Sequence, residues 1–575
     1  MRKIIIIIIL LLPLFVNAQS TYYVAPDGDD EGNGTIVDPW ATWGHAFNAS
    51  GVVAGDTVYF RGGVYYKDHN TEPQSNFALG YGYIGYEIDN RGTSGNPIYY
   101  WAYPGEQPIL DCSLDPEDDG SGTNVAVRSN VSYCHFKGLT IRKVLQAETG
   151  GMTETSAWLI SGCEETIFEN CVVHDIGGTG FKLWSGDFIK FINCDAYNCC
   201  DSLGDNGYQF GNDGAGFSLF DISDGDSVIV KGCRAWNCGD QGFSISNDGE
   251  EAYLLVDSCW SFRNGVMTTG SAPGLGHGFK AGWSQPDTDS TILRNSLSIY
   301  NRYSAFTTND VGHLSGNLRV YNNLFYGSYD FNGLGYGGYG VQINNYDGDG
   351  TDRWFYNNIS YDHQSVNQIY AGTYVGTNNT WQTSTGVTVT DDDFLNIDSV
   401  AIIGILLGPR NADSTLKWGD LRNYLGLAST SDLIDAGIDK GVGDDIGAFQ
   451  YAAQNPAVNP TVITGQIWNT SKTGARVIGN TTDDGGGDVS QKGVCWSESE
   501  NPDTGDNKTE EGAGAGSFNS VITGLTENTT YHVRAYATNE AGTAYGADQE
   551  FKTLKAGYVG NGVNILWHNG KIIYF

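Results

Sequence analysis

Apolar and polar residues alternate over short stretches through most of this chain. Typical segments are IKFINCDAYN at 189–198 and DSVIVKGCRAWN at 226–237, in which β-branched residues are frequent. A period of two with this composition predicts β-strands, and the clusters of Gly, Asn and Asp between the segments mark turns. The pattern therefore predicts a protein made mostly of short strands.

Two sets of residues repeat in step along the middle of the chain. One is aromatic and is spaced by 36, 26, 36 and 27 residues: Phe181, Phe217, Phe243, Phe279 and Phe306. The other is mainly cysteine and asparagine: Cys134, Cys171, Cys194, Cys233, Cys259, Ser296, Asn323 and Asn358. Repeats of roughly 20–40 residues are typical of solenoids, whose coils stack apolar positions on one another. We predict an all-β chain: a right-handed parallel β-helix (solenoid) followed by a small β-sandwich.

The chain divides by composition into four segments. Residues 1–18 have the basic start, apolar run and small-residue end of a secretory signal, which predicts a secreted or extracellular protein with no membrane span after cleavage. Residues 19–452 are the predicted β-helix and catalytic domain, with coils from about Asn96 to about Asp393 and a short helical segment near Ala41–Asn48 as a cap. Residues 457–553 are the predicted β-sandwich, and residues 554–575 a tail with a hairpin at Asn569-Gly570.

The net charge limits the classes of partner, and the cysteine positions predict part of the core. There are 31 Lys and Arg against 67 Asp and Glu, for a net charge of −36, which argues against nucleic acid as a partner. The net charge does not exclude a polyanionic ligand, because a groove can carry its own Lys and Arg, and we expect a monomer. The periodic cysteines predict a stack of buried thiols, with Cys199, Cys200 and Cys238 as possible disulfide partners.

Alignment on the repeated phenylalanine predicts which residues share one surface. Equivalent positions of neighbouring coils lie about 4.7–4.9 Å apart. The residue after each phenylalanine gives the row Lys182, Ser218, Ser244, Lys280 and Thr307, which should point outward. Nearby positions bring a second group of polar residues within a few coils of Lys280: Asp213, Asp240, His277 and Arg302.

Several segments resemble the β-helix domain of family 9 polysaccharide lyases. They are YYVAPDG, AGDTVYFRGGVYY, NPIYYWAYPGEQPILD, GHGFKAG and GPRNAD with the closing DIGAFQY, and together they span roughly residues 21–452. The resemblance implies that Lys280 is the Brønsted base. It also implies a calcium site, but Ala215, Gln241 and Ser244 stand where the family has Asp. Asp240 remains, so calcium is a doubtful cofactor. Residues 457–553 resemble fibronectin type III-like modules, with Tyr531 at their corner position.

Elimination from a uronate needs a base for the C5 proton and a positive group that stabilises the adjacent carboxylate. The predicted catalytic residues are Lys280, His277 and Arg302. The predicted substrate-binding residues are Lys182, Trp184, Trp283 and Tyr303, and the predicted metal ligands are Asp213 and Asp240. Each has a structural alternative, since lysines also occur on solvated surfaces and aspartates at turns.

Three functions fit this sequence. The first is a secreted lyase that cleaves a uronate-containing polysaccharide by β-elimination. The second is a glycoside hydrolase on the same scaffold, which would act on a sulfated or acidic algal polysaccharide such as a fucan or a carrageenan-like polymer through paired carboxylates such as Asp213 and Asp240. The third is a carbohydrate-binding solenoid without catalytic activity.

Overall fold

The computed structural model describes most of the chain. The described residues are 19–68, 72–73, 77–80, 83–114, 123–146, 155–200, 214–220, 227–246, 253–266, 274–282, 290–308, 318–330, 337–343, 353–365, 367–369, 375–382, 388–434, 436, 447–448, 459–468, 470–483, 489–514, 516–539, 541–555, 565–568 and 571–574. The predicted signal segment lies outside them. The chain separates into two compact units, Met1–Pro409 with Leu416–Tyr451, and Arg410–Thr415 with Ala452–Phe575.

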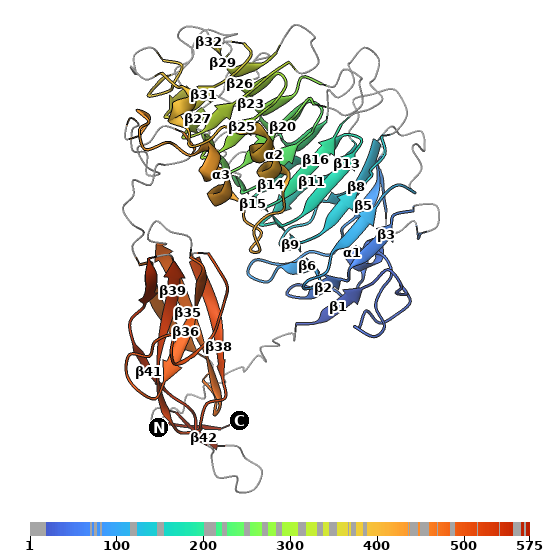
Figure 1. Ribbon diagram of the computed structural model, residues 1–575. Helices are drawn as coiled ribbons and strands as arrows, with labels where there is room; N and C mark the ends of the chain where they lie inside the picture. Colours follow the sequence, from blue (N-terminus) through green and yellow to red (C-terminus); the bar gives the residue numbers. More distant parts are fainter. Residues whose placement is uncertain are drawn as a thin grey trace, which may run out of the picture. The chain divides into compact units, whose positions relative to one another are not determined.

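The first unit is a β-helix of three long sheets (Figure 1). Each coil contributes one strand to each sheet, so neighbouring strands are parallel, apart from the antiparallel pair β4 and β5. Sheet 1 contains, in spatial order, β1 (Thr21–Val24), β2 (Thr57–Phe60), β6 (Ile98–Ala102), β9 (Cys134–Lys137), β12 (Ile167–Glu169), β15 (Ile189–Ile192), β18 (Ser227–Lys231), β21 (Tyr253–Asp257), β24 (Ser290–Arg294), β27 (Leu318–Tyr321), β30 (Arg353–Tyr356) and β33 (Val375–Thr377).

The other two sheets complete the coils. Sheet 2 contains β3 (Gly63–Tyr66), β7 (Pro108–Asp111), β10 (Thr140–Arg142), β13 (Val172–Ile176), β16 (Asp195–Cys199), β19 (Arg234–Trp236), β22 (Trp260–Phe262), β25 (Leu297–Ile299), β28 (Leu324–Tyr326) and β31 (Ile359–Tyr361). Sheet 3 contains β4 (Phe77–Gly80), β5 (Tyr83–Glu87), β8 (Thr123–Ser129), β11 (Ser156–Glu164), β14 (Thr179–Asp187), β17 (Ala215–Leu219), β20 (Gln241–Ser246), β23 (His277–Gly282), β26 (Ser304–Thr308), β29 (Tyr339–Ile343) and β32 (Gln368–Ile369). The predicted fold class is confirmed.

The repeated phenylalanines stack along the inside of sheet 3. Phe181, Phe217, Phe243, Phe279 and Phe306 pair in register from strand to strand, and all five are fully buried. Successive rings from Phe181 to Phe279 are stacked with centroids 4.9–5.0 Å apart. Offset stacking of this kind adds roughly 0.5–1.5 kcal/mol per pair beyond the burial of apolar area. The repeat predicted from the sequence is therefore the main core of the coils.

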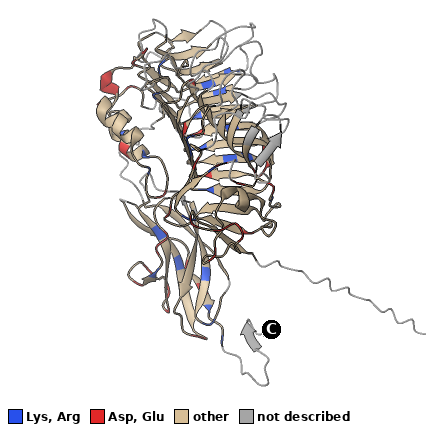
Figure 2. Ribbon diagram, turned by 90° about the vertical axis from the view of Figure 1, so that its right-hand side faces the viewer, with Lys and Arg blue, Asp and Glu red and all other residues tan. Residues whose placement is uncertain are grey.

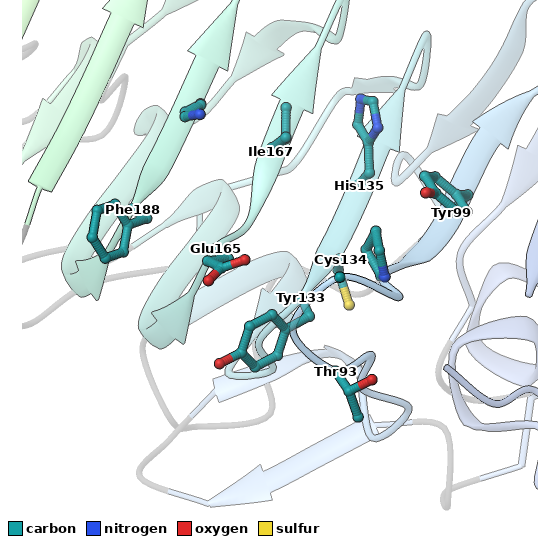
Figure 3. Close-up of a pocket in the computed structure, with 11 residues that line it drawn as sticks. Thr93, Tyr99, Tyr133, Cys134, His135, Glu165, Ile167 and Phe188 are labelled. Atoms are coloured by element: carbon teal, nitrogen blue, oxygen red, sulfur yellow. The ribbon is translucent and has the colours of Figure 1, made fainter. Parts of the chain in front are cut away.

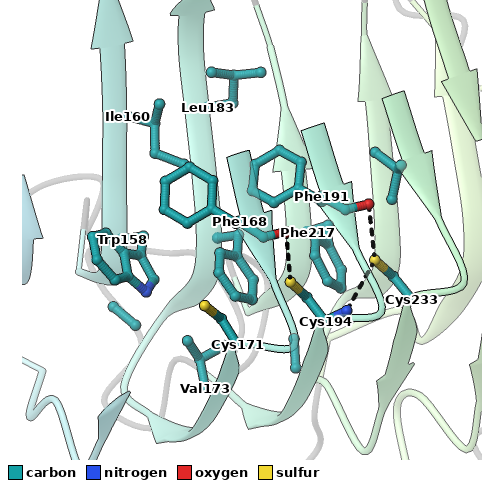
Figure 4. Close-up of a cluster of buried hydrophobic side chains, with 14 of the residues drawn as sticks. Trp158, Ile160, Phe168, Cys171, Val173, Leu183, Phe191, Cys194, Phe217 and Cys233 are labelled. Carbon is teal, nitrogen blue, oxygen red and sulfur yellow. Dashed lines mark hydrogen bonds between the residues drawn. The ribbon is translucent and has the colours of Figure 1, made fainter. Parts of the chain in front are cut away.

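The cysteine repeat is a ladder of free thiols inside the coils (Figure 4). The thiol of Cys194 donates to the carbonyl of Phe168 at 3.3 Å, and the sulfur of Cys233 accepts the amide N–H of Cys194 at 3.4 Å. Asparagine replaces cysteine in later coils, where the Asn323 side chain accepts the Ser296 N–H at 2.9 Å. The predicted thiol stack is confirmed, and all eleven cysteines are unbridged.

A short helix closes the N-terminal end of the core, as predicted. Helix α1 (Trp43–Asn48) begins where the Thr42 hydroxyl accepts the amide N–H of His45. Its Trp43 and Phe47 rings are fully buried, and Phe47 lies 5.2 Å from the Tyr100 ring. The helix thus covers apolar surface that an open terminal coil would expose to water.

The ends of the coil region differ from the prediction. Parallel pairing starts at Thr21 rather than near Asn96, because the alternating segment that contains Thr57–Phe60 pairs with β1 on one side and with β6 on the other. Strand β33 ends at Thr377, and a 3-10 helix (Asp391–Asp393), α2 (Ser399–Leu407) and α3 (Trp418–Leu425) follow it. The phenylalanine and cysteine/asparagine repeats run only from Cys134 to Asn358, so they give no signal for where the coils begin or end.

Helices α2 and α3 pack on the outer face of sheet 2. Ile402 and Leu421 share a buried cluster with Trp260 and other sheet residues. Arg234 of β19 fastens the end of α2, since its guanidinium pairs with the Asp195 carboxylate at 2.7–2.9 Å and donates to the carbonyls of Leu406 and Gly408 at 3.0 and 2.8 Å. These bonds satisfy carbonyls at the end of the helix that lack a partner within it.

The second unit contains two antiparallel sheets around one core. One sheet contains β34 (Thr461–Trp468), β35 (Gly474–Asp483) and β38 (Gly516–Thr523), and the other β36 (Gln491–Ser497), β37 (Asn507–Lys508), β39 (Thr530–Asn539), β40 (Gly542–Tyr545) and β41 (Gln549–Lys552). Val477 and Val533 meet in the core between them. Tyr531 is buried and its hydroxyl accepts the Thr526 N–H at 3.0 Å. Two further strands, β42 (Ile565–His568) and β43 (Lys571–Tyr574), pair with each other.

No described helix is long and apolar enough to cross a membrane.

Candidate active site

Strand β23 of sheet 3 carries His277 and Lys280 on the same outward side. In a regular strand, positions three apart face opposite ways. Here Phe279 is buried, and a Cβ on Gly278 would collide with the buried Ser298 hydroxyl, so both of these residues face the interior. The glycine allows two successive inward residues, and the flanking His277 and Lys280 then both turn outward.

Lys280 lies in the row predicted from the sequence. It pairs with Ser244 on β20 and with Thr307 on β26, and Lys182 and Ser218 continue the row. Its side chain is 20% exposed, and its ammonium nitrogen lies 3.9 Å from a carboxylate oxygen of Asp240. That distance allows electrostatic attraction but exceeds a hydrogen bond. The amino group can thus approach a ligand.

Asp240 precedes β20 and is held by backbone groups of the following coil. One carboxylate oxygen accepts the Leu275 N–H at 3.2 Å, and its carbonyl accepts the N–H groups of Gly276 and His277 at 2.8 and 2.7 Å. The residue is buried. Asp240 therefore positions the start of β23 and sets a negative charge beside Lys280.

His277 is a buried, neutral imidazole. Its pKa is well below the usual range because burial disfavours the charged ring, and the positive charges of Lys280 and Arg302 add to this effect. Its Nδ1 is 2.6 Å from the Ser304 hydroxyl, and the Tyr303 ring contacts it edge-on at 5.0 Å. A neutral imidazole has one donor and one acceptor nitrogen, so His277 can hydrogen-bond a ligand or relay a proton.

Arg302 is placed beside the site but beneath its surface. Its side chain is 1% exposed, donates to the Gly274 carbonyl at 2.8 Å, and lies 3.6 Å from an Asp330 carboxylate oxygen. These contacts fix the segment leading into His277. Its predicted catalytic role stays a prediction, and its contacts give it a positioning role.

The predicted substrate-binding residues divide into two places. Tyr303 stands against His277 and, on its other side, is 5.7 Å from the Tyr339 ring. Lys182 lies three strands away from Lys280 in the same row, about 14 Å at the usual strand spacing. Its ammonium group is 5.3 Å from the Trp184 ring centre, a cation–π arrangement that positions both side chains.

Two predicted residues, Asp213 and Trp283, lie outside the described residues. Within the described residues, no three His, Cys, Asp or Glu side chains gather as they would around a metal ion. Asp240 brings one carboxylate, which lies 3.9 Å from the Lys280 ammonium nitrogen. Because Ca²⁺ takes 6–8 oxygen ligands, the described residues by themselves do not fit a calcium site.

The structure adds contacts that the sequence analysis missed. Ser304 could have been found, since it follows His277 in the same register position on the next strand. Asp330, the charged neighbour of Arg302, could not, because it falls outside every repeat. The backbone carbonyl of Gly274 leaves no sequence signal at all.

Comparison with known proteins identifies the class of enzyme. Pectate lyase L of Dickeya chrysanthemi is 27% identical over 446 residues, which covers 76% of this chain and 91% of that relative. Pectate lyase PEL9 of Emericella nidulans is 25% identical over 318 residues, covering 50% and 69%. The predicted class, a polysaccharide lyase, is confirmed.

The family follows from a family model. Residues 22–363 match the model described as "Pel9A-like, right handed beta helix region". Because the match covers more than half of the 575 residues, the chain belongs to this family.

Two solved structures agree with this assignment. A rhamnogalacturonan lyase has a TM-score of 0.59 at 26% identity, covering 71% of this chain and 97% of its own. The pectate lyase Pel9A has a TM-score of 0.54 at 22% identity, covering 76% and 97%, and this likeness concerns the fold.

Proposed function

We propose that this protein is a secreted lyase that cleaves a galacturonate-containing polysaccharide by β-elimination, with Lys280 as the base. The observation that carries the proposal is the placement of Lys280. Its amino group is partly exposed on the outer face of sheet 3, and it lies 3.9 Å from the Asp240 carboxylate, which is longer than a hydrogen bond. The substrate class is supported by the names of the relatives, two pectate lyases and a rhamnogalacturonan lyase.

The reaction assigns a task to each group. The unprotonated Lys280 nitrogen takes the proton from C5 of a uronate, the electron pair forms the C4–C5 double bond, and the bond from C4 to the glycosidic oxygen breaks. The leaving oxygen takes up a proton from the solvent or from the site. Neutral His277, hydrogen-bonded to Ser304, lies beside Lys280 on the same side of β23 and can relay protons.

The row of residues that contains Lys280 indicates how the polymer chain lies on sheet 3. Because Lys182 lies about 14 Å from Lys280 along sheet 3, it can pair with the carboxylate of a sugar two or three residues from the reacting one. Trp184 beside it offers an aromatic face to the same sugar. We propose that the bound chain runs across the strands of sheet 3.

The decisive experiment measures ultraviolet absorbance and reducing ends together on pectic and other acidic polymers. Wild type should give both signals, because elimination creates a conjugated double bond. Lys280→Ala and Lys280→Arg should both lose activity by about 10³-fold or more, since arginine keeps the charge but cannot act as a base near neutral pH. Lys231→Ala, an exposed lysine on sheet 1, is the matched control.

Two outcomes would contradict the proposal. Activity that survives in Lys280→Arg would show that position 280 supplies charge rather than a base. Reducing ends without absorbance would indicate hydrolysis, and the search would then move to Asp240 and Asp213.

The remaining finer predictions belong to the same proposal. The burial of Tyr531 and its bond to the Thr526 amide support a fibronectin type III-like accessory module, because such modules use a tyrosine in this way. Calcium dependence is tested by chelation followed by return of calcium, and secretion by identifying the mature N-terminus near Gln19.

A further inference from the structure

The outer face of sheet 1 holds a pocket away from the strands that carry Lys280. It lies over β6, β9, β12 and β15, and its volume is about 390 Å³ (Figure 3). Its main side chains are Tyr99, Tyr133, His135, Glu165, Phe188 and Lys190. The volume lies within the range of about 300–1,000 Å³ that small-molecule sites occupy.

Three of these residues occupy equivalent corners of successive coils. Tyr133, Glu165 and Phe188 each precede a strand of sheet 1 and have φ of 60°, 43° and 54°. The coils also have positive φ at their other corners, such as Asn295 between β24 and β25, and there the residue is mainly asparagine, because short polar residues tolerate positive φ. A bulky aromatic residue there is unfavourable for the fold, and Phe188 is also 51% exposed. Core packing therefore does not explain the exposed ring of Phe188.

Among the described charged groups around the pocket, one cation is left available. Burial acts to raise the pKa of Glu169, but hydrogen bonds from His135 and Lys137 hold it at about 2, so this carboxylate is occupied. Lys190 is flanked in its row by Ile167 and Ile229. Among the described residues, no carboxylate lies within ion-pair distance of Lys190. Figure 2 shows that several Lys and Arg positions of this unit lie on strands.

We propose that this pocket binds one acidic sugar residue of the polysaccharide, apart from the bond that is cleaved. Tyr99, Tyr133 and Phe188 offer apolar surface to the sugar ring, and Lys190 pairs with its carboxylate. The exposed Glu165 accepts hydrogen bonds from its hydroxyl groups. The choice of an acidic sugar over a neutral one rests on the function proposed above and on the charge of Lys190, which no carboxylate of the described residues pairs with.

The pocket and Lys280 belong to different sheets of one β-helix, so binding and cleavage can be measured separately. The test titrates Lys280→Ala protein, which cannot turn over substrate, with tetragalacturonate in a calorimeter. Two binding sites per chain are expected. Adding Phe188→Ala with Lys190→Ala should leave one, while adding Lys231→Ala, an exposed lysine of the same sheet, should leave two. The fully methyl-esterified tetramer should lose the pocket site because its carboxylates are neutral.

One result would overturn the inference. The variant with both Phe188→Ala and Lys190→Ala would still bind the tetramer at two sites, while its thermal unfolding midpoint showed that it folds normally. Equal binding of the methyl-esterified tetramer would overturn the assignment of an acidic sugar. If wild type forms no unsaturated product but the pocket variants still lose one site, the proposed function fails and the pocket remains.

Discussion

At the scale of single residues, burial decides which groups can titrate or react. His363 is an example away from the active site. Its Nδ1 accepts the Ser328 N–H at 3.0 Å, and its Nε2 is 3.1 Å from the Phe325 carbonyl. Burial lowers its pKa to about 3. The ring is therefore held in one neutral tautomer, and its two hydrogen bonds join neighbouring coils.

This burial predicts a loss of stability in mild acid. Unfolded histidine has a pKa near 6.5, so below that pH the unfolded chain binds a proton that the folded chain does not. The free energy of unfolding should then fall by roughly 1.4 kcal/mol per pH unit for His363 between about pH 6 and pH 4. His277, whose pKa is also lowered, acts in the same direction.

Urea unfolding at several pH values measures this slope. His363→Gln should reduce the dependence of the unfolding free energy on pH by the contribution of one histidine. It should also lower the stability at pH 7. An unchanged slope in the variant would contradict the assignment.

At the scale of elements, the coils are joined by side-chain ladders as well as by strands. Asn323 is fully buried, accepts the Ser296 N–H, and donates to the Leu293 carbonyl at 3.1 Å. Cys194 holds the corresponding position in an earlier coil with a weaker donor. The step from thiol to amide along the ladder changes the strength of the link but keeps its position.

Asn323→Ala should therefore destabilise the protein more than Cys194→Ala. The asparagine variant leaves a buried amide and a buried carbonyl without partners, at about 1–3 kcal/mol for each group. The cysteine variant loses mainly packing, at about 1 kcal/mol. Chemical denaturation of both variants measures the difference, and equal losses would show that the hydrogen bonds of the ladder add nothing.

The attachment of α2 makes a second prediction at this scale. Arg234→Met removes the guanidinium that pairs with the buried Asp195 carboxylate and should cost about 3–5 kcal/mol. Adding Asp195→Leu should restore part of the loss, because no buried charge then remains. A double variant no more stable than Arg234→Met would contradict this account.

At the scale of the whole molecule, the two units have separate cores. The β-helix core and the core around Val477 and Val533 share no residue. All the described candidate catalytic residues belong to the first unit. The catalytic machinery therefore depends on the β-helix.

A chain that ends at Tyr451 should keep its activity on soluble polymer within about two-fold. The removed residues include none of the described candidate catalytic residues, so the stabilisation of the transition state should not change. The measurement is the initial rate of unsaturated product formation, with circular dichroism as the control for folding. Loss of activity in a folded truncated chain would show that the second unit takes part in catalysis.

The sequence by itself determined the repeat, and with it the residues that stack inside the coils and those that face outward. Spacing placed the phenylalanine and cysteine stacks inside the coils and put Lys182 and Lys280 in one outward row, because strand periodicity and coil length are properties of the local chain. It also singled out Lys280 through a resemblance. Only the tertiary structure decided that Gly278 turns His277 and Lys280 to the same side, that Arg302 is buried against Asp330, and that α2 covers sheet 2. These contacts join residues with no common period, so only the packed fold brings them together.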